Sequence, residues 1–284
     1  MADTLAPISN QSTLLSGQRI AYGKHGQGTK TPVVLVHGTP TTSLIWRNVV
    51  PSLVDAGFEV YTFDLLGYGL SERPRDPSVD TSITAQVSVL EGLLKYWGLD
   101  EQKKFHIVGH DIGGAIVQRF AILSPGRTSI VMIDCLSLDT YSTDDAKLSR
   151  ESSDQDHRAR FREWFLSAVY KKAGFERGAL GTYLDYISGP IGQPSLVQHQ
   201  ITHYDPKHTH EVSGRYHELG RFPVKLIWGE HDGWQKVSWA QRLQSAIPGA
   251  SLDILPEAGH FSIEDRPEDI CTILETFFQS LGGT

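Results

Sequence analysis

Cysteine is scarce in this chain of 284 residues, which holds only Cys135 and Cys271. Both lie in apolar stretches, where a buried thiol is more typical than a bridge, so we expect no disulfide framework and a reducing compartment, the cytoplasm. Long apolar runs are missing too, since none approaches the roughly 20 residues that cross a bilayer. The N-terminal MADTLAPISNQS has neither a basic flank nor an apolar core, so we expect no signal peptide.

Positive charge is also in short supply. The 26 Lys and Arg are outnumbered by 33 Asp and Glu, which leaves a formal net charge of -7. An acidic chain is disfavoured as a partner of nucleic acid or of an anionic membrane. The remaining composition, 39% hydrophobic and 21% charged, is typical of a soluble globular domain with an insertion, and we expect a monomer or homodimer.

Short β-branched runs alternate with helical stretches along most of the chain. This alternation predicts an α/β fold, with a mostly parallel central sheet and helices on both faces. The predicted strands cover 31–38, 58–69, 105–111, 129–135, 223–232 and 251–260.

The alternation is interrupted once, between 136 and 222, by a stretch rich in charge, aromatics and histidine. It has helical segments but no strong strand. We interpret 136–222 as a helical cap inserted into a core formed by 1–135 and 223–284. The alternative is an ordinary second domain with its own core, but the position of the stretch beside the turns described below favours a lid.

The stretch FHIVGHDIGGAIVQRF predicts a sharp turn from a strand into a helix, with Asp111 at the turn. Such a turn strains its central residue and needs small neighbours two positions away, where Gly109 and Gly113 stand. Asp111 would lie above the C-terminal edge of the sheet, where ligands bind, and the helix N-terminus would stabilise its charge. The alternative is that Asp111 only caps the helix.

A second turn, VHGTP, follows an earlier predicted strand. The His37-Gly38 turn would let the backbone N–H of Thr39 point into the site, and the N–H of Ile112 is the natural second donor. Two such donors form an oxyanion hole. The alternative for His37 and Gly38 is a plain turn at the end of a strand.

Two late strands end in residues that complete a catalytic set. WGEHD ends at Asp232, and EAGH ends at His260. The chain order is then nucleophile, acid and base, with Asp111 first. Asp134, at the end of SIVMID, is an alternative acid.

These motifs resemble those of the α/β-hydrolase superfamily, in the branch that holds epoxide hydrolases and haloalkane dehalogenases. The similarity runs over about 20 to 280 and rests on HGTPTTSLIWRNVVPSL, DLLGYGLSERP and GHDIGG. It implies the α/β-hydrolase fold, the cap and an aspartate nucleophile. Some members of this branch take the acid from the position of Asp134, but WGEHD is intact here, so Asp232 is favoured.

A carboxylate nucleophile suits attack on a saturated carbon that carries a leaving group. Asp111 would form an alkyl-enzyme ester, and His260 would then activate a water molecule to hydrolyse that ester. Asp232 would orient His260. The expected partners are therefore a small organic substrate and water, with no cofactor.

The motifs leave the identity of the leaving group open. Dehalogenases of this branch have Trp after the nucleophile, where this chain has Ile112. Trp164 in the cap could be the remnant of a halide donor, but we favour a core aromatic there. Epoxide hydrolases use cap tyrosines as ring-opening acids, often in a Tyr-Arg pair, which is absent from SLVQHQITHYD. The candidates left open are Tyr183, Tyr186 and Tyr204.

We predict an epoxide hydrolase-like enzyme on a small or medium organic molecule. The alternatives are a haloalkane or haloacid dehalogenase, an ester or lactone hydrolase, and a small-molecule receptor on the same fold. Histidines gather at 199, 203, 208, 210 and 217. They lack acid or cysteine ligands at convincing spacing, so we expect no metal site.

Overall fold

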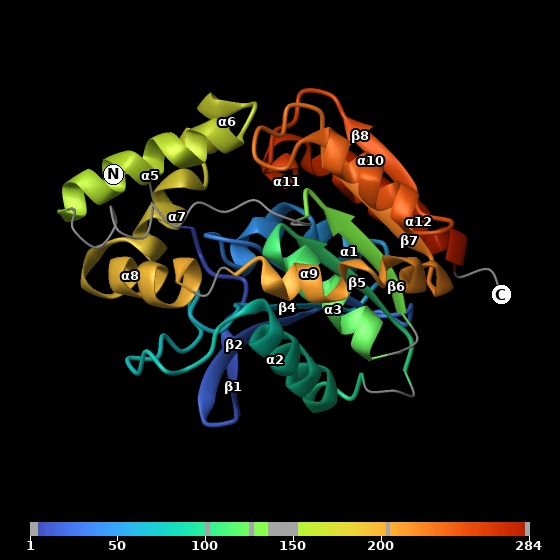
Figure 1. Cartoon of the computed structure of the whole chain (residues 1–284), viewed down its shortest axis with the longest axis horizontal. Helices are drawn as coiled ribbons and strands as arrows, with labels where there is room; N and C mark the ends of the chain where they lie inside the picture. Colours follow the sequence, from blue (N-terminus) through green and yellow to red (C-terminus); the bar gives the residue numbers. More distant parts are fainter. Residues whose placement is uncertain (1–4, 100–102, 125–127, 136–152, 203–204, 282–284) are drawn as a thin grey trace.

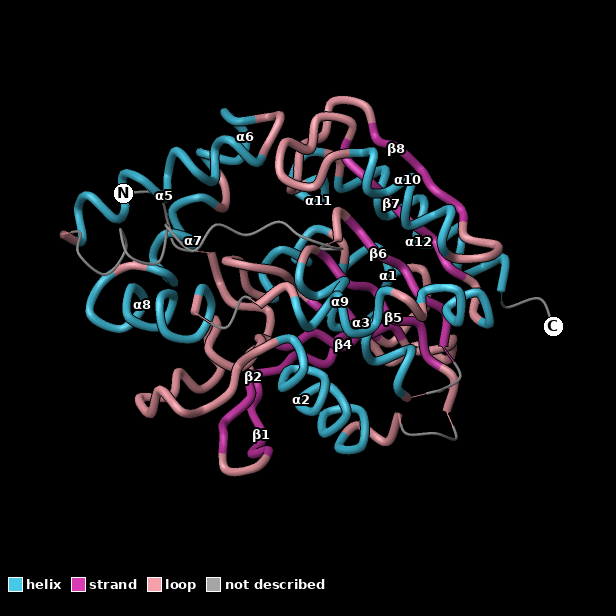
Figure 2. Tube along the Cα trace, in the orientation of Figure 1, coloured by secondary structure: helices cyan, strands magenta, loops and turns pink. Residues whose placement is uncertain are grey.

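The computed structural model describes residues 5–99, 103–124, 128–135, 153–202 and 205–281. An eight-stranded sheet runs through the centre in the order β1-β2-β4-β3-β5-β6-β7-β8 (Figure 2). The strands are β1 (Gln11–Leu15), β2 (Gln18–His25), β3 (Val33–Val36), β4 (Val60–Phe63), β5 (Phe105–His110), β6 (Thr128–Ile133), β7 (Val224–Gly229) and β8 (Ser251–Leu255). All pairs from β4 to β8 are parallel, so the predicted α/β fold is confirmed.

The hairpin of β1 and β2 is a strand pair that the sequence reading missed. It adds two antiparallel strands to the edge of the sheet next to β4. Ser16 and Gly17 connect them with positive φ angles of 49° and 80°. Two consecutive positive φ angles are typical of the tight turns that match strand twist. The Ser-Gly pair between two alternating segments was therefore a local signal for this hairpin.

Helices cover both faces of the sheet because alternate side chains of each buried strand point to opposite sides. In β3, Val34 and Val36 join one hydrophobic cluster, and Val33 and Leu35 join the other. The first cluster includes α2 (Ile83–Tyr96), α3 (Ile112–Leu123) and α10 (Val237–Ala246). The second includes η1 (Ser43–Asn48), α1 (Val50–Asp55) and α12 (Pro267–Leu281).

Four helices of the inserted stretch gather at one end of the molecule (Figure 1). They are α5 (Asp154–Ala168), α6 (Lys172–Arg177), α7 (Leu180–Ile187) and α8 (Gly189–Ser195), and a π-helix, η2 (Leu196–Ile201), follows them. Buried side chains of α5, α6 and α7, together with Leu196 of η2, share the second cluster with the core. Within the same stretch, α9 (Lys207–Ser213) and η3 (Tyr216–Arg221) pack against α3 instead.

The cap boundaries 136–222 stay a prediction, because 136–152 lies outside the described residues. In the described part of the chain, no helix is long and apolar enough to cross a membrane. Cys135 and Cys271 are both free and buried.

Candidate active site

Asp111 lies at the turn between β5 and α3, with φ 51° and ψ -120°. This is a strained conformation for a residue with a side chain. A Cβ on Gly109 would come within 2.4 Å of Gly113 O, and one on Gly113 within 2.4 Å of Val36 O. The turn therefore requires both glycines. The Asp111 side chain does not cap α3, so its carboxylate is available for other contacts.

Two backbone donors hold the Asp111 carboxylate. The N–H of Thr39 donates to Oδ2 at 2.8 Å, and the N–H of Ile112 also hydrogen-bonds the carboxylate. A Cβ on Gly38 would lie 2.5 Å from Asp111 Cβ, so only glycine allows this approach. His37 supports the turn, because its Nδ1 donates to Gly38 O and its Nε2 accepts from a backbone N–H.

The other oxygen of Asp111 faces a histidine. Oδ1 lies 3.7 Å from Nε2 of His260, whose Nδ1 lies 3.0 Å from Oδ2 of Asp232. The second oxygen of Asp232 accepts from the backbone N–H groups of Trp234 and Gln235, each at 2.8 Å. Asp232 is therefore fixed on both sides. The structure thus brings together Asp111, His260 and Asp232, which the sequence predicts as nucleophile, base and acid.

Asp134 lies close by but has different partners. Its Oδ1 accepts from the N–H of Gly229 at 2.7 Å, and its Oδ2 accepts from the hydroxyl of Ser262. These bonds tie the ends of β6 and β7 to the segment after His260. The geometry therefore favours Asp232 over Asp134 as the acid that contacts the histidine.

The charges in this buried cluster determine its proton affinities. Burial lowers the pKa of His260, but the negative charges of Asp232, Asp111 and Asp134 outweigh it and raise that pKa to about 9. Burial raises the pKa of Asp111, against the opposing effects of His260 and the two backbone donors. Burial, aided by the charge of Asp232, raises the pKa of Asp134 well above its ordinary value. The resting site therefore favours an ion pair between His260 and its carboxylates.

Aromatic side chains line the histidine. The ring of Trp234 lies 4.7 Å from that of His260, and Trp164 of α5 packs on Trp234 at 3.9 Å. Both indoles are partly exposed. Trp164 thus contacts the site from the cap through Trp234. The sequence analysis does not name Trp234, although its position two residues after Asp232 is a local signal.

The three tyrosine candidates from the cap differ in placement. The hydroxyl of Tyr183 donates to Glu264 at 2.8 Å, and Glu264 also pairs with Arg47 at 2.6 Å. This network joins the cap to the core, so we withdraw Tyr183 as a ring-opening acid. Tyr186 is half-buried near Asp64, whose charge helps burial raise the pKa of Tyr186. Tyr204 lies outside the described residues.

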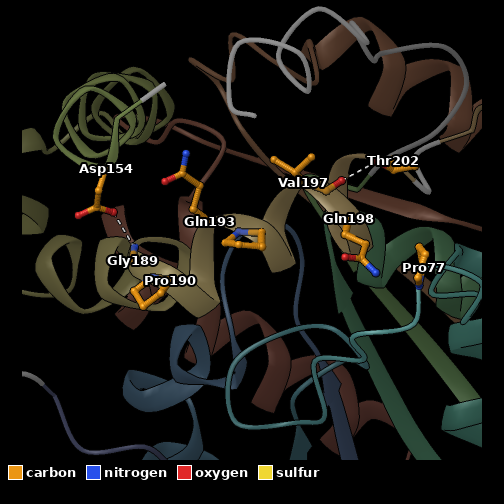
Figure 3. A pocket seen from close by; sticks show the side chains of 9 residues that line it. Pro77, Asp154, Gly189, Pro190, Gln193, Val197, Gln198 and Thr202 are labelled. Atoms are coloured by element: carbon orange, nitrogen blue, oxygen red, sulfur yellow. Dashed lines mark hydrogen bonds between the residues drawn. The ribbon is translucent and has the colours of Figure 1, made fainter. Parts of the chain in front are cut away.

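A separate hollow of ≈ 710 Å³ lies between the cap helices and the loop that follows β4 (Figure 3). None of the three residues Asp111, Asp232 and His260 lines it. Its lining is Pro77, Asp154, Gly189, Pro190, Gln193, Pro194, Val197, Gln198 and Thr202. In the described part of the chain, no group of three or more His, Cys, Asp or Glu is arranged to hold a metal ion.

Comparison with known proteins finds a matching family and several relatives. A family model described as "Alpha/beta hydrolase family" matches residues 33–273. The chain is 26% identical to the "Cis-3-alkyl-4-alkyloxetan-2-one decarboxylase" of Shewanella oneidensis, over 98% of this chain and 90% of that protein. It is 28% identical to "Haloalkane dehalogenase 2" of Mycobacterium tuberculosis, over 88% of this chain and 89% of that one.

Solved structures share the same architecture. An alpha/beta hydrolase fold protein from Burkholderia ambifaria superposes with a TM-score of 0.84 at 28% identity, covering 96% of this chain and 99% of that one. The epoxide hydrolase CorEH superposes with a TM-score of 0.77 at 23% identity, covering 95% and 98%. At that identity, the second similarity speaks for the fold alone.

Proposed function

The chain belongs to the alpha/beta hydrolase family and is an enzyme of the hydrolase class, and we propose that it works through a covalent ester between Asp111 and a saturated carbon of its substrate. The observation that carries this proposal is the division of labour between the two oxygens of Asp111. Oδ2 is held by Thr39, whereas Oδ1 faces His260 across 3.7 Å. The oxygen that faces the histidine is the one proposed to attack the substrate carbon.

The same division suits the second half of the reaction. Once Oδ1 is esterified, Oδ2 is the carbonyl oxygen and already accepts from the N–H of Thr39, and the N–H of Ile112 is a second donor to the same carboxyl group. When water attacks the carbonyl carbon, the negative charge develops on this oxygen, where the two donors stabilise it. The position of the Thr39 donor thus suits both steps.

His260 acquires its role as a base from the first step. In the free enzyme the charge of Asp111 contributes to the raised pKa of His260, which favours the imidazolium. Ester formation removes that charge, so the pKa of His260 falls and the imidazole can take a proton from water. Asp232, at 3.0 Å, holds the ring and stabilises the cation that forms.

For the substrate we propose a small or medium organic molecule with an epoxide or a comparable strained ring. Opening a strained ring at a saturated carbon leaves an ester that only water can release, as the two-step site requires. Ile112 follows the nucleophile and has no side-chain donor for a halide. A dehalogenase is the second candidate, supported by the similarity to "Haloalkane dehalogenase 2" and by the partly exposed Trp164 and Trp234 near His260.

Trapping the ester tests the proposal. His260→Gln should stop hydrolysis and leave Asp111 heavier by the substrate fragment, read by mass spectrometry after a panel of epoxides, haloalkanes and lactones. His260→Gln with Asp111→Asn is the matched control and should stay unmodified. If the wild-type enzyme turns over a panel member while His260→Gln never gains mass at Asp111, the covalent mechanism is wrong.

A further inference from the structure

A pair of hydroxyl groups lies beside the nucleophile and is not used by the steps above. The hydroxyls of Thr39 and Tyr68 are 2.5 Å apart, and either can be the donor. Both side chains are buried, with exposed fractions of 6% and 2%. Thr39 also gives its N–H to Asp111 Oδ2 at 2.8 Å. Three covalent bonds separate this nitrogen from the Thr39 hydroxyl, so the hydroxyl lies near the Asp111 carboxylate.

The structure holds Tyr68 firmly in its turn after β4. The N–H of Tyr68 donates to Leu65 O at 2.9 Å, and its ring packs edge-on against His37 at 5.4 Å. His37 is itself anchored, since its Nε2 accepts from the N–H of Leu65 at 2.9 Å. Gly67 and Gly69, with φ angles of 89° and 48°, flank Tyr68 and shape the turn. The backbone of Tyr68 is therefore held by the turn, and its ring is held by packing against His37.

We propose that Thr39 and Tyr68 deliver the proton that an oxygen leaving group needs, an inference that rests on the covalent mechanism proposed above. When Tyr68 donates to Thr39, the single proton of the Thr39 hydroxyl is directed to a third acceptor. A leaving oxygen beside Asp111 is that acceptor. Thr39 is then the catalytic residue that touches the leaving oxygen, and Tyr68 acts through it.

The proton affinities favour this transfer. An alkoxide released from an opened ring is far more basic than a phenolate, because tyrosine has an ordinary pKa of about 10. Threonine alone is too weak an acid to end as the anion. The phenol behind it takes up the negative charge, so the pair is needed rather than either hydroxyl alone.

The step balances in protons and electrons. Asp111 Oδ1 forms a bond to the ring carbon, and the electron pair of the broken carbon–oxygen bond goes to the oxygen. That oxygen takes the proton of Thr39, and Thr39 takes the proton of Tyr68. Hydrolysis of the ester later leaves Asp111 as a carboxylic acid, and its ionisation returns one proton to Tyr68.

This assignment places the ring-opening acid on the core rather than on the cap. A ring-opening acid on the core explains how the enzyme can work without a Tyr-Arg pair in the cap. It also agrees with the hydrogen bond that the Tyr183 hydroxyl donates to Glu264. It also sets the substrate class, because a leaving oxygen needs a proton and a leaving halide does not. The pair therefore favours strained cyclic ethers over haloalkanes.

Single-turnover ester formation in the His260→Gln background tests the pair, with epoxyhexane and bromohexane as matched probes. Thr39→Val removes the hydroxyl and keeps the backbone N–H, Tyr68→Phe removes only the phenol oxygen, and Thr39→Ser is the conservative control. We expect Thr39→Val and Tyr68→Phe to slow ester formation from epoxyhexane by about 10²- to 10⁴-fold, the usual range for general acid catalysis. Thr39→Ser should retain most of the rate.

Leaving-group dependence separates catalysis from a structural role. With bromohexane the same variants should slow by less than about 10-fold, since bromide needs no proton. A solvent deuterium isotope effect on the epoxide reaction should be present in the parent and lost in Thr39→Val. Equal losses with both probes, an unchanged rate with epoxyhexane, or a retained isotope effect would overturn the assignment. If the wild-type enzyme turns over a probe but the His260→Gln protein forms no ester with it, the covalent mechanism itself fails.

Discussion

Oδ1 of Asp111 and Nε2 of His260 lie 3.7 Å apart, and both side chains are 1% exposed. This separation is too long for a hydrogen bond, yet it is short enough for strong electrostatic coupling in a buried site. The charge of each residue therefore shifts the pKa of the other, although no hydrogen bond joins them. This allows the chemical state of Asp111 to control the basicity of His260.

Removing the charge of Asp111 should lower the pKa of His260 below about 9. Asp111→Asn keeps the shape of the side chain and imitates the neutral ester. Because a nearby negative charge favours the imidazolium, its loss shifts the imidazole to the neutral form at lower pH. An NMR titration of the His260 ring measures the shift. Glu268→Gln, a change at an exposed acid on α12, is the control and should leave the titration where it was. An unchanged His260 pKa in Asp111→Asn would contradict the coupling.

Asp232 and Asp134 should differ sharply when each is replaced by asparagine. Asp232→Asn should slow hydrolysis of the ester by about 10³- to 10⁴-fold, because the neutral amide no longer stabilises the imidazolium. Asp134→Asn should cost less than about 10-fold, because an amide can still accept from Gly229 and donate to Ser262. Mass spectrometry of the ester as it decays measures the hydrolysis rate in each variant. Losses of equal size would mean that Asp134 shares the role of the acid.

Tyr183→Phe should reduce stability and leave the chemistry intact. It removes the bond from the phenol to Glu264 at 2.8 Å, a bond to a charged group worth about 1.5–3 kcal/mol. We expect urea unfolding to show a loss of this order, with ester formation changed by less than a few-fold. Tyr170→Phe, at an exposed position of the cap, is the matched control and should change neither the stability nor the rate of ester formation. A large loss of ester formation in Tyr183→Phe would restore this tyrosine as a candidate acid.

Gly113→Ala should destabilise the nucleophile turn. The added methyl group would lie 2.4 Å from Val36 O and 2.5 Å from His37 O, both backbone atoms that cannot move alone. Overpacking of this kind costs about 1–3 kcal/mol or more. Gly181→Ala in α7 is the control, since nothing lies within 4 Å there and alanine is the better helix former. The midpoint of urea unfolding should fall for Gly113→Ala and rise slightly for Gly181→Ala.

Much of the core follows from local patterns in the chain. The parallel strands are continuous apolar runs, and the turn at Asp111 is marked by glycines two positions on either side, so both are visible without any tertiary contact. The hairpin at Ser16 and Gly17 is likewise marked by residues next to each other in the chain. Secondary structure and tight turns are decided by the spacing of residues that are close in the chain, and the sequence by itself therefore determined the α/β core and the positions of its loops.

The pairing of polar groups was decided only by the tertiary structure. The Thr39 hydroxyl meets the phenol of Tyr68, the Tyr183 phenol meets Glu264, and Trp164 meets Trp234. The two hydrogen bonds join residues that are 29 and 81 positions apart in the chain, so no local spacing predicts them. Which hydroxyl faces the nucleophile depends on how whole elements pack, because a shift of one helix or turn would exchange the partners.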